Sequence, residues 1–126
     1  MSTDKPSDEN RDPSAVLDPG CVATIHHFDL VGRLYPAFIT ELTEMLAALR
    51  VAVAAVDRPT IRRLTHRFRG SAAQLGAGGL ARALHAIEEA ASDEGRAALD
   101  GVLVGLDDLV QVTIAALLRE VERAPR

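Results

Sequence analysis

Apolar residues recur at steps of three and four along most of this chain, and no other feature restricts the possible folds as strongly. The clearest example lies between residues 37 and 56. Its repeating apolar positions are Phe38, Leu42, Met45, Leu49 and Val53. Residues with this spacing lie on one face of an α-helix. The pattern therefore predicts a long helix that buries a single apolar stripe.

Three later stretches repeat the pattern. Asp57 and Pro59 favour a helix over 59–75, because aspartate caps helices and proline suits a first turn. Two further helices are predicted over 79–91 and 94–122. The inward positions expected in these three helices are Ile61, Leu64, Phe68, Ala72, Leu75, Leu80, Leu84, Ile87, Ala91, Leu99, Val102, Leu106, Leu109, Val110, Thr113, Leu117 and Val121.

A short helix over 24–34 is predicted before the long ones, with Pro36 ending it or opening the next helix. Four long amphipathic helices with short connections indicate an all-α fold. The expected architecture is an antiparallel up-down-up-down four-helix bundle with a short additional N-terminal helix covering one end. The composition agrees, because Ala and Leu supply 37 of the 126 residues and aromatic residues only 3%.

Two segments are expected along the chain. Residues 1–20 contain three prolines among polar residues and are predicted to form a flexible N-terminal tail. Residues 21–126 are predicted to form one helical domain, which suits a chain of this length.

Composition also excludes several classes of protein. The formal net charge of −4 is unfavourable for a general nucleic-acid binder. A single cysteine, Cys21, rules out an intrachain disulfide and a cysteine-based zinc cage. The longest apolar run, 51–56, is too short for membrane insertion, and no charged-then-apolar leader opens the chain. The expected compartment is therefore the cytoplasm.

His66 is the candidate for chemistry on the helix over 59–75. When that helix is projected at about 100° per residue, His66 lies nearly opposite the core positions, so an exposed ring is expected. An exposed imidazole is a nucleophile near neutral pH, and neighbouring arginines such as Arg69 suit a phosphoryl group. The arrangement suggests a phosphohistidine.

Gly70 lies on the same outward side, one turn beyond His66. A glycine inside an exposed helix costs about 1 kcal/mol relative to alanine, so its presence needs a reason. Two explanations are open. The missing side chain gives a large partner access to the imidazole, or it permits close helix packing.

The stretch from His66 to Ala77, HRFRGSAAQLGA, resembles the motif of histidine-containing phosphotransfer (HPt) domains. That family shows His, two residues, a basic residue, Gly, Ser or Ala, and then Leu-Gly-Ala at the end of the helix. The resemblance covers roughly 30–121, and its other positions are Phe38, Leu42, Leu49, Asp57, Ile61, Leu64, Leu80, Leu84, Ile87 and Glu88. One departure is Arg69, where the family usually has lysine, so a planar fork replaces a point charge.

This resemblance implies a role in two-component signalling. His66 would accept a phosphoryl group from the aspartyl phosphate of a response-regulator receiver domain and pass it to another receiver. Arg69 would stabilise the phosphate, and Gly70 would provide steric access. No cofactor of its own is expected, because transfer depends on positioning and charge, and the receiver brings Mg²⁺. A hybrid sensor kinase is a further expected partner.

The sensor-kinase dimerisation helix is another class with an exposed histidine. In that class an acidic residue follows the histidine, and a proline often lies a few residues further on. Here Arg67 follows His66, and the next proline is Pro125. The chain is therefore expected to be a phosphoryl carrier without independent kinase activity.

Two binding alternatives have weaker support. A metal site built from the four histidines is disfavoured, because His26 and His27 point in different directions and no His-x-x-x-His pair occurs on a predicted helix. His85 is expected to be a solvated surface residue. The arginine cluster within 58–69 resembles a nucleic-acid patch, but its only aromatic residue, Phe68, projects into the core. Phosphate handling and attraction to an acidic receiver are the simpler roles for these arginines, which are Arg58, Arg62, Arg63, Arg67 and Arg69.

A helical adaptor that binds signalling proteins without phosphate chemistry is the remaining alternative. Its bundle would be the same, so only a phosphorylation experiment separates it from a phosphoryl carrier.

Overall fold

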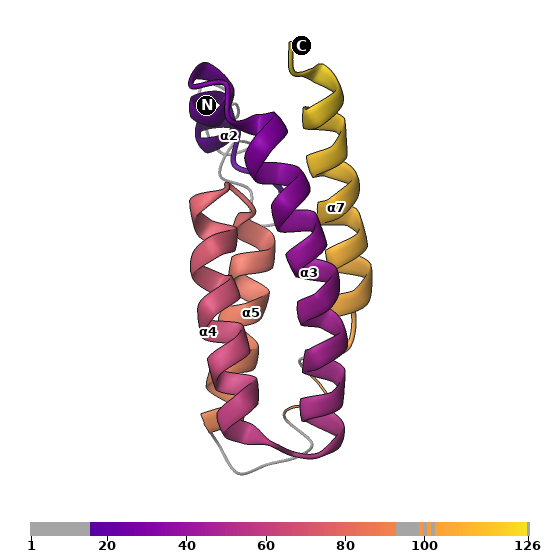
Figure 1. Cartoon of the computed structure of the whole chain (residues 1–126). Helices are drawn as coiled ribbons and strands as arrows, with labels where there is room; N and C mark the ends of the chain where they lie inside the picture. Colours follow the sequence, from indigo (N-terminus) through magenta and orange to yellow (C-terminus); the bar gives the residue numbers. More distant parts are fainter. Residues whose placement is uncertain (1–15, 93–98, 100, 102, 126) are drawn as a thin grey trace.

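The structure is a computed structural model that describes residues 16–92, 99, 101 and 103–125. Its helices are α2 (Pro19–His27), α3 (Val31–Ala54), α4 (Arg58–Gln74), α5 (Gly78–Ser92) and α7 (Leu106–Arg123). No strand occurs in the described part of the chain. Figure 1 shows α3, α4, α5 and α7 running alternately in opposite directions, with α2 at the end where α3 begins.

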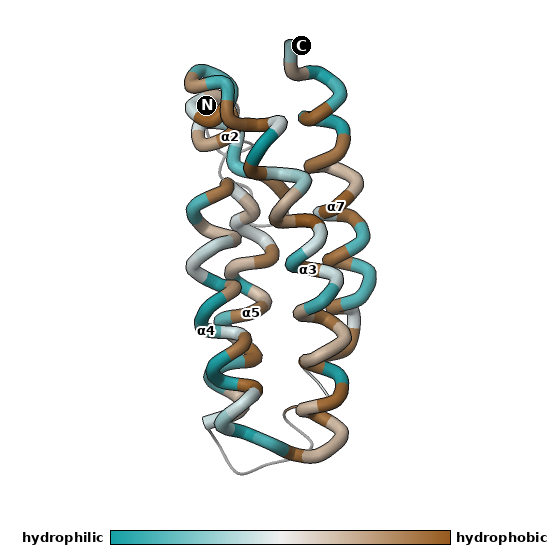
Figure 2. The backbone as a smooth tube through the Cα atoms, in the orientation of Figure 1, coloured by the Kyte–Doolittle hydropathy of each residue, from teal (hydrophilic) through white to brown (hydrophobic). Residues whose placement is uncertain are grey.

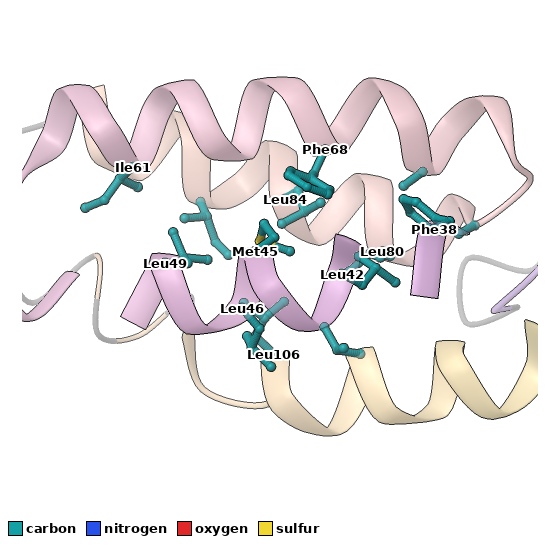
Figure 3. Packing of buried hydrophobic residues seen from close by; sticks show 14 of the residues in the cluster. Phe38, Leu42, Met45, Leu46, Leu49, Ile61, Phe68, Leu80, Leu84 and Leu106 are labelled. Atoms are coloured by element: carbon teal, nitrogen blue, oxygen red, sulfur yellow. The ribbon is translucent and has the colours of Figure 1, made fainter. Parts of the chain in front are cut away.

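The four long helices form a closed arrangement around one core. α4 packs against α3 and α5, and α7 packs against the same two helices from the other side. Figure 3 shows side chains from all four helices pointing into the space between them. The predicted all-α antiparallel four-helix bundle with a short N-terminal helix is therefore confirmed.

The apolar stripes lie where the periodicity placed them. The predicted stripes of α3 and α5 are buried throughout, and brown apolar segments alternate with teal polar ones along α3 in Figure 2. On α4, Leu64 and Leu75 are only partly buried, at the edge of the core. Thr65 is fully buried although it was not predicted, and its hydroxyl donates to the Ile61 carbonyl at 2.8 Å. That bond satisfies the buried hydroxyl without a partner on another helix.

The predicted helix over 24–34 is wrong in its bounds. The chain instead turns after His27, where Asp29 has a φ of 60° and the Leu30 amide donates to the Ile25 carbonyl at 3.0 Å. A new helix, α3, then starts at Val31. Pro36 neither ends nor opens a helix, because it lies inside α3. It is the sixth residue of α3, and because it has no N–H, the helix lacks the one bond that this residue would donate to the Gly32 carbonyl.

The predicted N-terminal tail, 1–20, lies mostly outside the described residues. The structure describes residues 16–20 of this segment, and two of them, Pro19 and Gly20, belong to α2. The proline occupies the first turn, where its fixed φ suits the start of a helix.

The single helix predicted over 94–122 is interrupted. Its predicted start and Val102 lie outside the described residues, but Val104 and Gly105 form a turn before α7 begins. Gly105 has a φ of 86°, a left-handed conformation that glycine adopts without steric cost. The apolar repeat continues across this turn, because Leu99 and Leu106 are both buried.

Both ends of α4 are fixed by hydrogen bonds. At its start, Asp57 accepts from the backbone N–H and the hydroxyl of Thr60, at 3.3 Å and 2.6 Å. These bonds hold the pKa of the Asp57 carboxyl below its usual value. The cap predicted from Asp57 is thus present, and it sets where the helix begins.

The other end of α4 is anchored to α2. Gly76 has a φ of 87°, and a Cβ added there would lie only 3.2 Å from the Cβ of Cys21. The Asp18 amide donates to the Gly76 carbonyl at 2.7 Å, and the Cys21 thiol donates to the Gln74 carbonyl at 3.3 Å. Carbonyls that a helix end leaves unpaired are thereby satisfied by α2 and the residue before it.

Tyr35 closes the same end from α3 and gives a pH-dependent prediction. Its side chain is fully buried, and its hydroxyl donates to the Leu75 carbonyl at 3.1 Å. Burial, more than the charges nearby, raises the pKa of Tyr35 to about 12. An unfolded chain releases this proton near pH 10 while the folded chain keeps it, so the free energy of unfolding should fall between pH 10 and 12.

Urea unfolding at pH 9 and pH 11.5 measures this effect. The wild type should lose about 2 kcal/mol more than Tyr35→Phe over that interval, since phenylalanine has no proton to release. Equal losses in the two proteins would show that Tyr35 does not control the alkaline stability.

Candidate functional site

His66 lies midway along the outward face of α4. The opposite face of that helix is buried through Ile61, Thr65, Phe68 and Ala72. The His66 side chain is 67% exposed, as the helical projection predicted. With both ends of α4 fixed, the imidazole is presented to solvent from a rigid support.

One ring nitrogen of His66 is engaged. Its Nδ1 lies 3.0 Å from Oε2 of Glu88 on α5 and 3.1 Å from Nη2 of Arg69 on α4. A protonated Nδ1 donates to the carboxylate, whereas an unprotonated Nδ1 accepts from the guanidinium, so the two bonds belong to different tautomers. The hydrogen bonds formed among the described residues do not involve Nε2.

Glu88 favours the tautomer that makes Nε2 reactive. When Nδ1–H donates to the carboxylate, the lone pair of the neutral ring resides on Nε2. The Glu88 side chain is only 22% exposed, and its buried Oε1 lies 3.3 Å from Nε of Arg69. The arginine thus compensates the charge of the carboxylate that orients the histidine.

Arg69 is the centre of this cluster. Its Nε faces Glu88, its Nη2 faces His66, and its Nη1 lies 3.0 Å from Nδ1 of His85. Only a planar guanidinium presents several donors in such a fixed fork. The side chain is 34% exposed, so the guanidinium is partly accessible from solvent.

His85 lies at the surface, as predicted, but it also has polar partners that were not predicted. Its side chain is half-exposed, its Nδ1 contacts Arg69, and its Nε2 lies 3.2 Å from Oε2 of Glu89. Both of its ring nitrogens are therefore engaged, unlike those of His66. His85 and Glu88 are three residues apart on α5 and share one helix face.

Three other arginines of the cluster make contacts away from the imidazole. Arg58 and Arg62 donate to the Ala91 carbonyl, at 2.9 Å and 3.3 Å, and so help to satisfy the end of α5. The Arg67 guanidinium lies 5.1 Å from the centroid of the adjoining Phe68 ring. Among the residues that the structure describes, Arg69 is the one arginine of these five that contacts the His66 imidazole.

Gly70 is exposed, and a Cβ built on it would meet nothing within 4 Å. Close helix packing therefore does not explain the glycine. What it does create is a bare stretch of helix one turn from His66, and its effect on access stays a prediction.

A metal site and a membrane-spanning helix are two further possibilities. Among the described residues, no group of three or more histidine, cysteine, aspartate or glutamate side chains is arranged to hold a metal ion. None of the helices in the described ranges has the length and apolarity needed to cross a membrane.

A family model described as Hpt domain matches residues 33–124. The chain belongs to the Hpt domain family. The match begins in the first turn of α3 and ends just after α7, so α2 precedes it. Searches among curated proteins and among solved structures found no match.

Membership of the Hpt family identifies the general chemistry. Hpt domains carry out histidine phosphotransfer in two-component phosphorelays, and they interact with receiver domains. In this Hpt domain, the exposed imidazole of His66 on α4 lies beside the charged side chains of Arg69 and Glu88.

Proposed function

We propose that this Hpt domain is a phosphorelay intermediate in which His66 accepts a phosphoryl group from a receiver aspartyl phosphate and donates it to a second receiver. The observation that carries the proposal is the 3.0 Å contact between Nδ1 and Glu88, on a ring whose side chain is 67% exposed. This contact leaves Nε2 as the nucleophile on the accessible side.

His66 and the receiver's aspartyl phosphate account for every bond that forms or breaks in the proposed transfer. The Nε2 lone pair attacks phosphorus, the bond between phosphorus and the receiver's carboxylate oxygen breaks, and the carboxylate leaves with the electron pair. The ring then carries a positive charge and keeps its proton on Nδ1. Glu88 stabilises that charge through the same hydrogen bond, and the reverse sequence transfers the phosphoryl group to the next receiver.

The chain needs little further machinery in this scheme. When Nδ1 of His66 donates to Glu88, it no longer accepts from Arg69, so in this proposal the Arg69 guanidinium turns to offset negative charge on the phosphoryl oxygens. The receiver supplies Mg²⁺ and the acidic pocket. No cofactor of the Hpt domain itself is required. A hybrid sensor kinase as the initial source and a cytoplasmic location belong to the same proposal.

Arg69 gives a prediction for the transfer rate. Arg69→Ala should slow transfer by about 10²-fold, because a charge-stabilising donor beside the reacting group is lost. Arg69→Lys keeps the charge but not the fork, so its loss should be smaller. The measurement is the initial rate of transfer from a phosphorylated receiver domain.

Arg119→Ala is the matched control, because it removes an exposed cation from α7. Its rate should stay within about twofold of wild type, as for most surface substitutions. If Arg69→Ala transferred as fast as this control, Arg69 would have no part in the site.

Gly70 gives a prediction for access. Gly70→Ala should raise the free energy of unfolding by up to about 1 kcal/mol, because alanine is the better helix former. Gly70→Gln should block transfer from a receiver domain but leave labelling by phosphoramidate, a small donor, within about threefold of wild type. If the glutamine variant took phosphate from receivers at the wild-type rate, the open surface at Gly70 would not be needed for docking.

The experiment that tests the function is incubation with a phosphorylated receiver domain, followed by analysis of the label. A phosphohistidine is labile in acid and stable in base. The adaptor alternative predicts no label at all, even where the receiver binds.

A further inference from the structure

The middle of α7 is uncharged on the side that faces solvent as well as on the side that faces the core. Residues 109–118, LVQVTIAALL, contain no charged side chain. The exposed residues among them are Gln111, Val112, Ala115 and Leu118, and the valine and leucine are 48% and 46% exposed. A helix that is apolar all round is normally covered on every side. The exposed side of this segment is therefore a candidate contact surface.

We propose that this surface binds the same surface of a second copy of the chain, so that two copies form an antiparallel dimer. The surface, named the α7 face, consists of Asp108, Gln111, Val112, Ala115, Leu118 and Arg119, all of which are exposed. The inference goes beyond the proposed function, because the contact requires no phosphoryl group.

The charges of the α7 face identify the second copy as its partner. Asp108 and Arg119 are 11 residues apart, which places them about 20° apart in projection and about 16 Å apart along the helix. Neither side chain has an ion pair or hydrogen bond with another residue that the structure describes. A two-fold axis midway between them puts Asp108 of each copy opposite Arg119 of the other. The face is thus complementary to itself.

The apolar residues of the α7 face lie between these two ion pairs. In the same arrangement, Val112 of each copy lies opposite Ala115 of the other, and the small alanine lets the two helices approach closely. Association removes both exposed valines from water. Contact between single helices is small compared with most specific interfaces, so a weak dimer with a Kd of about 100 µM is expected.

The α7 face lies away from the site on α4. α7 and α4 each pack against α3 and α5, and Figure 1 shows them at opposite sides of the bundle. Both copies of the dimer therefore keep an exposed His66 ring. Substitutions on the α7 face, Arg119→Ala among them, should change the association of the chain but not the initial rate of phosphoryl transfer.

Sedimentation equilibrium of the full unphosphorylated chain, from about 10 µM to about 1 mM, measures the dimer directly. Val112→Lys should raise the Kd at least about tenfold, because it places two cations within the contact. The matched control is Val51→Lys, the same change at a valine of α3 that is 70% exposed and outside the α7 face. Its Kd should stay within about twofold of wild type.

Charge reversal tests the pairing itself. Asp108→Arg and Arg119→Asp each place like charges opposite one another when either variant pairs with itself, so each should dimerise at least about tenfold more weakly than wild type. In an equimolar mixture of the two variants every pair is again opposite in sign, and the Kd of the mixed dimer should return to within about threefold of wild type. Urea unfolding of each variant verifies that it is folded.

Three results would overturn the inference. The first is a wild-type chain that stays monomeric at about 1 mM. The second is a Val112→Lys variant that dimerises as strongly as Val51→Lys, because the contact would then lie elsewhere. The third is a mixture of the charge-reversed variants that associates no better than either variant alone. A monomeric wild type that cosedimented with phosphatidylcholine vesicles, and lost this binding in Val112→Lys, would assign the α7 face to a lipid surface instead.

Discussion

His66→Gln should abolish phosphoryl acceptance completely while leaving the fold intact. Glutamine has no nucleophilic ring nitrogen, so no phosphorus–nitrogen bond of this kind can form. The free energy of unfolding should change by less than about 0.5 kcal/mol, because the His66 side chain is 67% exposed and its ion pair is screened by solvent. Labelling by a phosphorylated receiver, together with urea unfolding, measures both quantities.

The choice of control follows from the structure. His85 is unsuitable because it contacts Arg69, and His26 is unsuitable because its Nε2 pairs with Glu120 at 2.8 Å. His27 is exposed, and its ring packs edge-on against Phe28 with 4.9 Å between centroids. His27→Gln should label at the wild-type rate. Label that persisted on His66→Gln would show that another residue is the phosphoryl acceptor.

Phe68→Ala should have the largest effect on stability, a loss of about 3–5 kcal/mol in the free energy of unfolding. The ring is only 4% exposed, and it extends from α4 toward Leu84 and Met45 in Figure 3. Alanine would leave a cavity between three helices that are held at their ends and so cannot close around it easily. Thermal or urea unfolding measures the loss.

An exposed residue of the same helix provides the comparison for Phe68. Arg63→Ala should change the free energy of unfolding by less than about 0.5 kcal/mol. A loss below about 1 kcal/mol for Phe68→Ala would mean that the ring is not part of the core, and it would contradict the packing of α4.

The bundle could be predicted because each long helix carries its burial pattern locally. Phe38, Leu42 and Met45 on α3 are buried as their spacing required. The helix ends were harder, since a proline near a helix start and a glycine inside an apolar repeat are each compatible with two outcomes. Pro36 proved to lie within α3, whereas Gly105 interrupts the last predicted helix.

The residues of the candidate site on α4 were predictable from the sequence, but their contacts with α5 were not. The outward positions of His66 and Gly70 follow from helical geometry alone. The contacts of Glu88 and His85 depend on how α5 is rotated and shifted against α4, which no local pattern specifies. The available signals were the family resemblance, which includes Glu88, and a pair of polar residues three apart on the facing helix. Neither signal says which side chains of α4 these residues meet.

The position of the phosphoryl group on the His66 ring gives the most direct test. The protein is labelled uniformly with ¹⁵N, phosphorylated with phosphoramidate, and examined by ¹⁵N and ³¹P NMR for coupling between phosphorus and each ring nitrogen. Because Nδ1 of His66 lies 3.0 Å from Glu88, the phosphoryl group should be bonded to Nε2, with a proton on Nδ1. A phosphoryl group on Nδ1, on another residue, or on none would contradict the proposed chemistry.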